Sequence, residues 1–298
     1  MTCGTYAAPV TRPERRTGLD HDLLGTTVTL PVPRDGAAPT VRLDYVHFSV
    51  LMRPDRRLAA VTGVGIDGAL LRDLDRDGID WRLDGRLPAD AQAGPELYAN
   101  NDLDRGHLVR RADAVWGDTI AEAQAGMVDT FHYTNAAPQA ARFNQGDQLW
   151  LGLETYLLNY AATYDQRLVV FTGPVLDLAD PTYRGVQIPL RFFKVAVFRT
   201  ADTDGDPGAP QLGATGYLLD QTPQINDLGD VLARGQALDV PPPLGPFRTF
   251  QMPITDLDTL TGLDLSQTAA VDRYQPVVAA GDSTSRWRRL TNYDQIVL

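Results

Sequence analysis

The sequence has little of what most metal cages, disulfide frameworks and membrane anchors require. Its single cysteine, Cys3, excludes an intramolecular disulfide and a cluster of thiolate ligands for zinc. No apolar run approaches the roughly 18 residues of a membrane span, and the first thirty residues lack the apolar core of a secretory signal. We expect a cytoplasmic protein that binds no membrane, or one exported without a signal peptide. The four histidines are too few to favour a site of several His ligands: His21, His47, His107 and His132.

Negative charge exceeds positive charge, with a formal net charge of −11 at pH 7. A protein that holds nucleic acid on a broad basic surface gains affinity from many phosphate contacts, so this balance argues against that class. It is compatible with an enzyme that contacts a few phosphates and then releases them. Lys194 is the only lysine, and the other basic residues are arginines, whose fork of N–H donors suits phosphate oxygens.

Alternating apolar residues predict an antiparallel sheet that follows an N-terminal arm. Residues 1–40 are rich in Pro, Arg, Thr and Gly, and we interpret them as an extended arm ending in a short strand at 27–32. The turn at Pro54-Asp55 predicts a hairpin between a strand near 43–50 and one at 57–64. Further strands are predicted at 167–172, 192–199 and 213–220.

Three segments have helical patterns. Residues 148–162 carry apolar side chains at 3.6-residue spacing and give the clearest helix, while 118–130 have helical composition and 253–265 are expected to hold a short final helix. Strands on both sides of a central helical segment predict an α+β fold in which helices pack on a central antiparallel β-sheet. No internal repeat is present, so we treat 41–298 as a single domain.

The acidic segment 73–84 has features of a calcium-binding loop, with acidic side chains at positions 1, 3, 5 and 12 and glycine at position 6. The last ligand, however, is Asp84 in place of glutamate, and Asp80 stands where an apolar residue is usual. Neither flank has a helical pattern. A polar turn between strands is the preferred interpretation, as is a surface hairpin loop for the similar run 202–207.

The residues with catalytic potential are concentrated in three short motifs. Asp104-Arg105-Gly106-His107 is followed by Tyr133-Thr134-Asn135-Ala136-Ala137-Pro138-Gln139 and then by Phe143-Asn144-Gln145-Gly146. Hydrolysis of a phosphodiester requires an activated water and a cation that neutralises charge on the phosphate. A neutral imidazole, with a pKa near ~6.5, takes a proton from water close to neutral pH, so His107 is the candidate base. The side-chain oxygen of Asn144 suits a hard, hydrated cation such as Mg²⁺.

The order of these motifs, with Trp150-Leu151-Gly152-Leu153-Glu154 after them, resembles that of the DNA/RNA non-specific endonucleases. These are ββα-metal (His-Me finger) nucleases, which include proteins like endonuclease G. The resemblance is specific over 101–154 and extends more loosely from about residue 45 to 264. It implies a ββα-metal catalytic element, hydrolysis of both DNA and RNA with little sequence preference, and dependence on Mg²⁺, for which Mn²⁺ can substitute.

The resemblance also implies a role for each motif residue. His107 matches the family's general base, Asn144 its one direct protein ligand of the metal, and Glu154 the acid that holds the metal through water. Arg105 matches the arginine that contacts the phosphate. Asn135 and Gln139 match positions that shape the site. We count Asn135 among the candidate catalytic residues.

Two departures from the family pattern leave alternatives open. The interval between Asn144 and Glu154 is longer than usual by what corresponds to Asp147-Gln148, and the family's upstream transition-state arginine has no secure counterpart, Arg86 being the candidate. A catalytically degenerate nuclease-fold binding protein, or a phosphodiesterase that acts on small nucleotides, would share most of these residues. Taken singly, His107 would be a surface histidine, Asn144 a turn residue and Glu154 a solvent-facing carboxylate, but their common order favours catalysis.

The partners follow from the expected activity. An uncontrolled nuclease endangers the cell that makes it, so we expect export, triggered activation, or an inhibitor or immunity protein in addition to the DNA and RNA substrates. The resemblance is compatible with a monomer and with a homodimer.

Overall fold

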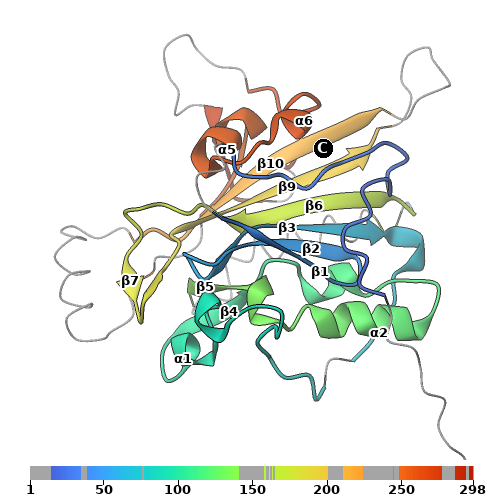
Figure 1. Ribbon diagram of the computed structural model, residues 1–298. Helices are drawn as coiled ribbons and strands as arrows, with labels where there is room; N and C mark the ends of the chain where they lie inside the picture. Colours follow the sequence, from blue (N-terminus) through green and yellow to red (C-terminus); the bar gives the residue numbers. More distant parts are fainter. Residues whose placement is uncertain are drawn as a thin grey trace, which may run out of the picture.

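An eight-stranded antiparallel sheet spans the molecule and carries other elements on both of its faces (Figure 1). The computed structural model describes residues 15–34, 39–75, 77–140, 165–200, 211–223, 248–276, 286–292 and 295–297, with the single residues 158, 161, 163 and 244. Across the sheet the strands follow the order β1 (Val41–Asp44), β2 (Phe48–Arg53), β3 (Leu58–Asp67), β6 (Arg167–Pro174), β9 (Arg191–Arg199), β10 (Leu212–Asp220), β11 (Arg248–Met252) and β12 (Arg288–Leu290). The predicted central antiparallel sheet is confirmed.

The central strands are buried on both faces, which explains their nearly continuous apolar sequences. All ten residues of β3 are buried, as are most residues of β6 and β9. The predicted hairpin between β2 and β3 is confirmed by the register Phe48↔Val64. The strand expected near 43–50 is instead two strands, because His47 has a φ of 71°, which turns the chain between β1 and β2.

Two apolar cores cover the two faces of the sheet. One core contains residues from the segment 15–34 and from α5 (Ile254–Thr261), which lie with α6 (Ser266–Ala269) on the same side of the sheet (Figure 1). On the opposite face, Leu108, Val109 and Ala137 pack against β2, β3 and β6. The residues that surround the sequence motifs are therefore attached to the sheet by apolar contacts on this second face.

The helices agree with the sequence where the structure describes them. The helix expected at 118–130 is α2 (Ile120–Asp129), whose first turn is capped by the Thr119 hydroxyl, which accepts from the Glu122 N–H. The final helix expected within 253–265 is α5, which ends at Gly262 with a φ of 66°. A further short helix, α1 (Pro95–Tyr98), was not expected. Of the helix expected at 148–162, most residues lie outside the described part of the chain.

The N-terminal segment differs from the extended arm that its composition predicted. The strand expected at 27–32 is wrong, since residues 27–32 pair with no strand and the nearest sheet-like contact is an isolated bridge between Pro33 and Leu263. Val28 and Leu30 are nevertheless buried, so they serve as core residues of an irregular segment. The boundary of the domain at residue 41 stays a prediction. Among the described residues, no helix is both long enough and apolar enough to cross a membrane.

Candidate active site

A separate pair of antiparallel strands carries the candidate base; it is called the hairpin below, although residues 108–135, which include α2, connect its two strands. It consists of β4 (Leu103–His107) and β5 (Ala136–Ala140), with His107 opposite Ala136 and Arg105 opposite Pro138. Successive side chains of a strand point to opposite faces, so Arg105 and His107 project from the same face of β4. Arg105 is exposed and His107 is half-buried. The hairpin thus presents a cation and an imidazole side by side.

Gly106 separates these two side chains and makes room for the neighbouring strand. A Cβ atom at this position would overlap the side chain of Gln139, which packs across the hairpin at Gly106. Gln139 is one of the positions expected to shape the site, and its contact with Gly106 supplies a physical reason for the Arg-Gly-His order. The glycine allows the two strands to pair closely while Arg105 and His107 keep their common face.

Two aromatic side chains pack against the His107 ring. The Trp81 ring centroid lies 4.6 Å from the imidazole centroid, with 48° between the planes, and Phe131 meets the imidazole edge-on at 5.1 Å and 87°. Trp81 in turn contacts Phe131 at 5.4 Å and Tyr133 at 5.7 Å. Sequence reasoning assigned Trp81 no role, because it lies in the acidic segment 73–84 and is distant from His107 along the chain.

The Asn135 side chain holds the segment that follows His107 through hydrogen bonds to its backbone. Its side chain is fully buried, its Oδ1 accepts from the Val109 N–H at 2.8 Å, and its Nδ2 donates to the Val109 carbonyl at 2.9 Å and to the Thr130 carbonyl at 3.0 Å. The Asn135 backbone carbonyl also accepts from the Leu108 N–H at 2.9 Å. With all of its amide groups occupied by protein atoms, Asn135 holds the end of β4 in place.

Gln221 joins the far end of the hairpin to the large sheet. It directly follows β10, and its buried Oε1 accepts from the Ala140 N–H at 3.0 Å while its Nε2 donates to the Pro189 carbonyl at 2.7 Å. Ala140 is the last residue of β5. The hairpin is therefore fixed at both ends, by Asn135 near His107 and by Gln221 at Ala140. No sequence motif indicated Gln221.

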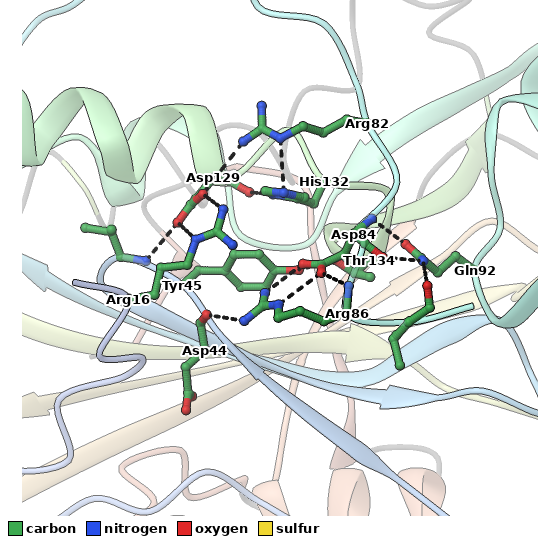
Figure 2. A network of polar contacts seen from close by, with 12 residues as sticks. Arg16, Asp44, Tyr45, Arg82, Asp84, Arg86, Gln92, Asp129, His132 and Thr134 are labelled. Carbon is green, nitrogen blue, oxygen red and sulfur yellow. Dashed lines mark hydrogen bonds and ion pairs between the residues drawn. The ribbon is translucent and has the colours of Figure 1, made fainter. Parts of the chain in front are cut away.

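A buried polar network links the sheet to the segment before β5 (Figure 2). The Tyr45 hydroxyl donates to Asp84 Oδ2 at 2.6 Å and, with its proton so placed, accepts from the Thr134 hydroxyl at 2.6 Å. Arg86 donates from Nε and Nη2 to the same carboxylate, at 2.9 and 2.7 Å, and from Nη1 to the Asp44 carbonyl at 2.8 Å. Burial alone would raise the pKa of Asp84, but the hydrogen bonds from Arg86 and Tyr45 hold it well below its usual range.

This network indicates the roles of Asp84 and Arg86, which the sequence had left uncertain. Both oxygens of Asp84 already accept hydrogen bonds, so it does not serve as the last ligand of a calcium loop, in agreement with the preferred interpretation of 73–84 as a polar turn. The guanidinium of Arg86 has each of its nitrogens engaged and lies over the Tyr45 ring at 4.6 Å. These contacts make Arg86 a structural residue.

A second part of the network surrounds His132 (Figure 2). Its Nδ1 lies 2.8 Å from the Asp129 carbonyl, and Arg82 Nε donates to its Nε2 at 3.1 Å, so the ring is neutral with its proton on Nδ1. Burial lowers the pKa of His132, and the Asp129 carbonyl opposes this shift only in part. Asp129 also binds Arg16, at 2.6 Å, which attaches the N-terminal segment to the end of α2.

Two buried donors close to the hairpin have no hydrogen-bond partner within the part of the chain that the structure describes. They are the Tyr98 hydroxyl, before β4, and Arg110 Nη1, after it. Burial raises the pKa of Tyr98 above its usual value, so its hydroxyl remains protonated. Both groups are hydrogen-bond donors enclosed by protein atoms.

The two residues expected to hold the metal, Asn144 and Glu154, lie outside the described residues. Within the described ranges, no group of three or more His, Cys, Asp or Glu side chains is arranged to hold a metal ion. His47 and His132 both lie in protein contacts, His47 stacked on Trp116 with ring centroids 3.7 Å apart. The structure therefore brings Arg105, His107 and Asn135 together around one hairpin and leaves the metal ligands untested.

Comparison with known proteins gives the same assignment as the motifs. The model of the DNA/RNA non-specific endonuclease family matches residues 29–272. An uncharacterized protein of Sinorhizobium fredii, y4fB, is 37% identical over 273 residues, which cover 86% of this chain and 37% of that protein. Human mitochondrial endonuclease G is 32% identical over 141 residues, covering 43% of this chain and 44% of that protein. This chain spans less than half the length of these curated relatives.

A solved structure shares the fold. It is the crystal structure of the EndoG/EndoGI complex, which aligns with a TM-score of 0.53 and 17% identity over 76% of this chain and 86% of that chain. Together with the large antiparallel sheet and its few helices, this likeness confirms the predicted α+β class with a ββα-metal nuclease fold. Because the family model matches most of this chain, the chain belongs to the DNA/RNA non-specific endonuclease family.

Proposed function

We propose that this protein is a metal-dependent endonuclease that hydrolyses phosphodiester bonds in both DNA and RNA. The observation that carries the proposal is the β4–β5 hairpin, in which Arg105 and His107 share one face of a strand fixed at both ends. Membership of the family supports the reaction class. The contacts proposed for Arg105 and His107 are to phosphate and not to base edges, so we expect weak sequence preference.

In the proposed reaction His107 accepts the proton of the attacking water, and Arg105 donates to an oxygen of the scissile phosphate. Asn135 acts as a positioning residue, because its buried side chain holds the backbone that follows His107. These roles divide the site into one base, one exposed cation and a fixed support.

The proposed metal is Mg²⁺, with Mn²⁺ as a substitute. Asn144 would hold it directly through an amide oxygen and Glu154 through water, a donor set that fits a hard cation keeping most of its hydration shell. The bound ion would neutralise charge that develops on the phosphate and on the leaving oxygen.

The test is cleavage of supercoiled plasmid and of structured RNA by the purified protein, in Mg²⁺ and in EDTA. Metal-dependent digestion of both polymers, abolished by His107→Ala and by Asn144→Ala, is expected. Digestion that persists in His107→Ala would refute the assigned base. A dinucleotide substrate run alongside separates the endonuclease from a phosphodiesterase of small nucleotides, and binding of DNA without cleavage in Mg²⁺ or Mn²⁺ would identify a degenerate binding protein.

We also propose that an inhibitor or immunity protein controls the activity. The solved structure that shares the fold is a complex in which EndoG is inhibited by EndoGI. A partner of this kind that covers Arg105 would stop cleavage by competing with the phosphate. Inhibition that is relieved by excess nucleic acid, and weakened by Arg105→Ala, is the expected kinetic signature; an inhibitor whose effect is independent of Arg105 and of substrate concentration would contradict it.

A further inference from the structure

Trp81 is the side chain that packs most directly on the candidate base, at 4.6 Å between ring centroids. It lies in the second half of the acidic segment 73–84, which has no function in the proposed reaction. The Trp81 ring is only half exposed to solvent and already contacts His107, Phe131 and Tyr133. Because the Trp81 ring already packs against these three side chains, we interpret it as a packing residue and not as a surface on which a nucleic-acid base stacks.

The backbone around Trp81 is itself held firmly. Arg82 pairs with the segment beside it, since its N–H donates to the Phe131 carbonyl at 3.0 Å and its carbonyl accepts from the Tyr133 N–H at 2.9 Å. The Arg82 side chain adds the hydrogen bond to His132. Trp81 is therefore anchored to the residues that lead into β5, and its ring has a fixed position relative to His107.

A general base acts efficiently only when its accepting nitrogen stays within hydrogen-bond reach of the proton, and a misplacement of about 1 Å can lower a rate by about 100-fold. The imidazole of His107 lies between the Trp81 ring and the edge of Phe131. Aromatic pairs at such separations have preferred geometries. Two rings in contact with His107 from different directions restrict rotation about its side-chain bonds.

We propose that Trp81 is a positioning residue that fixes the orientation of the His107 imidazole. The contribution to catalysis rests on the proposed nuclease function, whereas the restriction of the ring does not. The acidic segment has a calcium-loop pattern but forms no calcium site at Asp84. Its role is instead to bring Trp81 to the hairpin and Asp84 to the buried network.

The kinetic test compares Trp81→Leu and Trp81→Phe with a matched control, Trp287→Phe. Trp287 is also partly buried, packs on Phe250 and donates to Asp256, but it lies on the opposite face of the sheet from the hairpin. Trp81→Leu should lower kcat about 10- to 100-fold with KM changed less than about 3-fold. Trp81→Phe should recover most of kcat, and Trp287→Phe should leave both constants unchanged. An equal kcat for Trp81→Leu and wild type would overturn the proposal.

The second test needs no activity. With ¹³C at the histidine Cε1, the four histidines give four signals, and the one missing in His107→Gln belongs to His107. Trp81→Leu should move this signal and lower the order parameter of the His107 ring, whereas Trp81→Phe should keep the order parameter near that of wild type. An unchanged order parameter in Trp81→Leu would refute the positioning role. If Trp81→Leu does not fold, Trp81→Met replaces it, with the same expected results.

Together the two tests distinguish the proposals. A wild type that cleaves no nucleic acid would overturn the proposed function, and the order parameter would still decide whether Trp81 fixes His107. An active wild type whose His107 ring loses order in Trp81→Leu without a fall in kcat would overturn the positioning role alone.

Discussion

Replacement of Asn135 by alanine should weaken the fold and the site together. The substitution removes three buried hydrogen bonds and leaves the Val109 N–H, the Val109 carbonyl and the Thr130 carbonyl without their partner. Each buried backbone group left unpaired costs about 1–3 kcal/mol. Because water can enter the space left by the amide and satisfy some of them, we expect a total loss of about 3–5 kcal/mol, a large part of the ~5–15 kcal/mol that stabilises a typical domain.

The assay is urea unfolding at pH 7, with Asn101→Ala as the matched control. Asn101 also uses its amide to bind backbone groups, donating to the Leu97 carbonyl at 2.7 Å and accepting from the Leu103 N–H at 2.9 Å, but it is partly exposed. Water can replace its partners, so Asn101→Ala should cost only about 1 kcal/mol. Hydrogen exchange of the Leu108 and Val109 amides should accelerate in Asn135→Ala and not in the control.

Asn135→Asp tests the same geometry through its pH dependence. One carboxyl oxygen can still accept from the Val109 N–H, while the other faces the two carbonyls to which Nδ2 donated. Burial and these carbonyls should raise the pKa of the introduced carboxyl above its unfolded value of ~3.9, because only the protonated form can donate. Its stabilising contribution is then complete below that value and is lost as pH rises through the folded pKa.

Asn135→Asp should accordingly gain stability relative to Asn135→Ala when the pH is lowered from 7 to 5. The reasoning would be refuted by an Asn135→Ala variant that loses no more stability than Asn101→Ala, or by an Asn135→Asp variant whose stability relative to Asn135→Ala does not change with pH. Either result would mean that Asn135 does not hold the end of β4.

Three further outcomes are expected from the residues around the hairpin. Because the folded pKa of His132 is lowered, wild type should lose stability as pH falls below ~6.5, and His132→Gln, which can keep the hydrogen bond from Arg82, should lose less; unfolding free energies from pH 8 to 5 measure the difference. Gln221→Leu leaves two buried carbonyls and the half-buried Ala140 N–H without this partner and should destabilise the protein by about 2–4 kcal/mol, seen as a lower urea midpoint; a change under 1 kcal/mol would contradict the role in fixing β5. Gly106→Ala should displace Gln139, which lowers both kcat and the free energy of unfolding. Adding Gln139→Ala should restore the free energy of unfolding of the Gly106→Ala variant, as a double-mutant cycle can show.

The large sheet could be predicted from the sequence because its strands are regular and apolar. β2, β3, β6, β9 and β10 bury most of their residues, and the short-range pattern of apolar and β-branched residues indicates such strands without knowledge of their partners. α2 was predicted for a similar reason, since Thr119 and the residues after it have the composition of a capped helix. The exceptions occur where the chain bends, as at His47, or is buried without regular structure, as at Val28. The strands β11 and β12 were not predicted either.

The hairpin that carries the candidate base could not be predicted from periodicity. β4 consists of Leu-Asp-Arg-Gly-His and β5 contains Pro138, so neither has the alternation or the β-branched residues of an ordinary strand. They form strands because they pair with each other and because Asn135 and Gln221 hold their ends. Only the resemblance to a known family implied this element, and it did so through the identities of the residues in four ordered motifs and not through their strand propensity.

The contacts that support the site could not be predicted because the partners are remote in sequence. Asn135 binds Val109 across 26 positions, Gln221 binds Ala140 across 81, and Tyr45 binds Asp84 across 39. Motifs identify the residues that face the substrate, since the reaction restricts their chemistry, but a supporting glutamine or tryptophan resembles any other core residue until the fold shows what it touches. On the proposal that Trp81 orients His107, variants of supporting residues outside the motifs should affect kcat although they never contact nucleic acid.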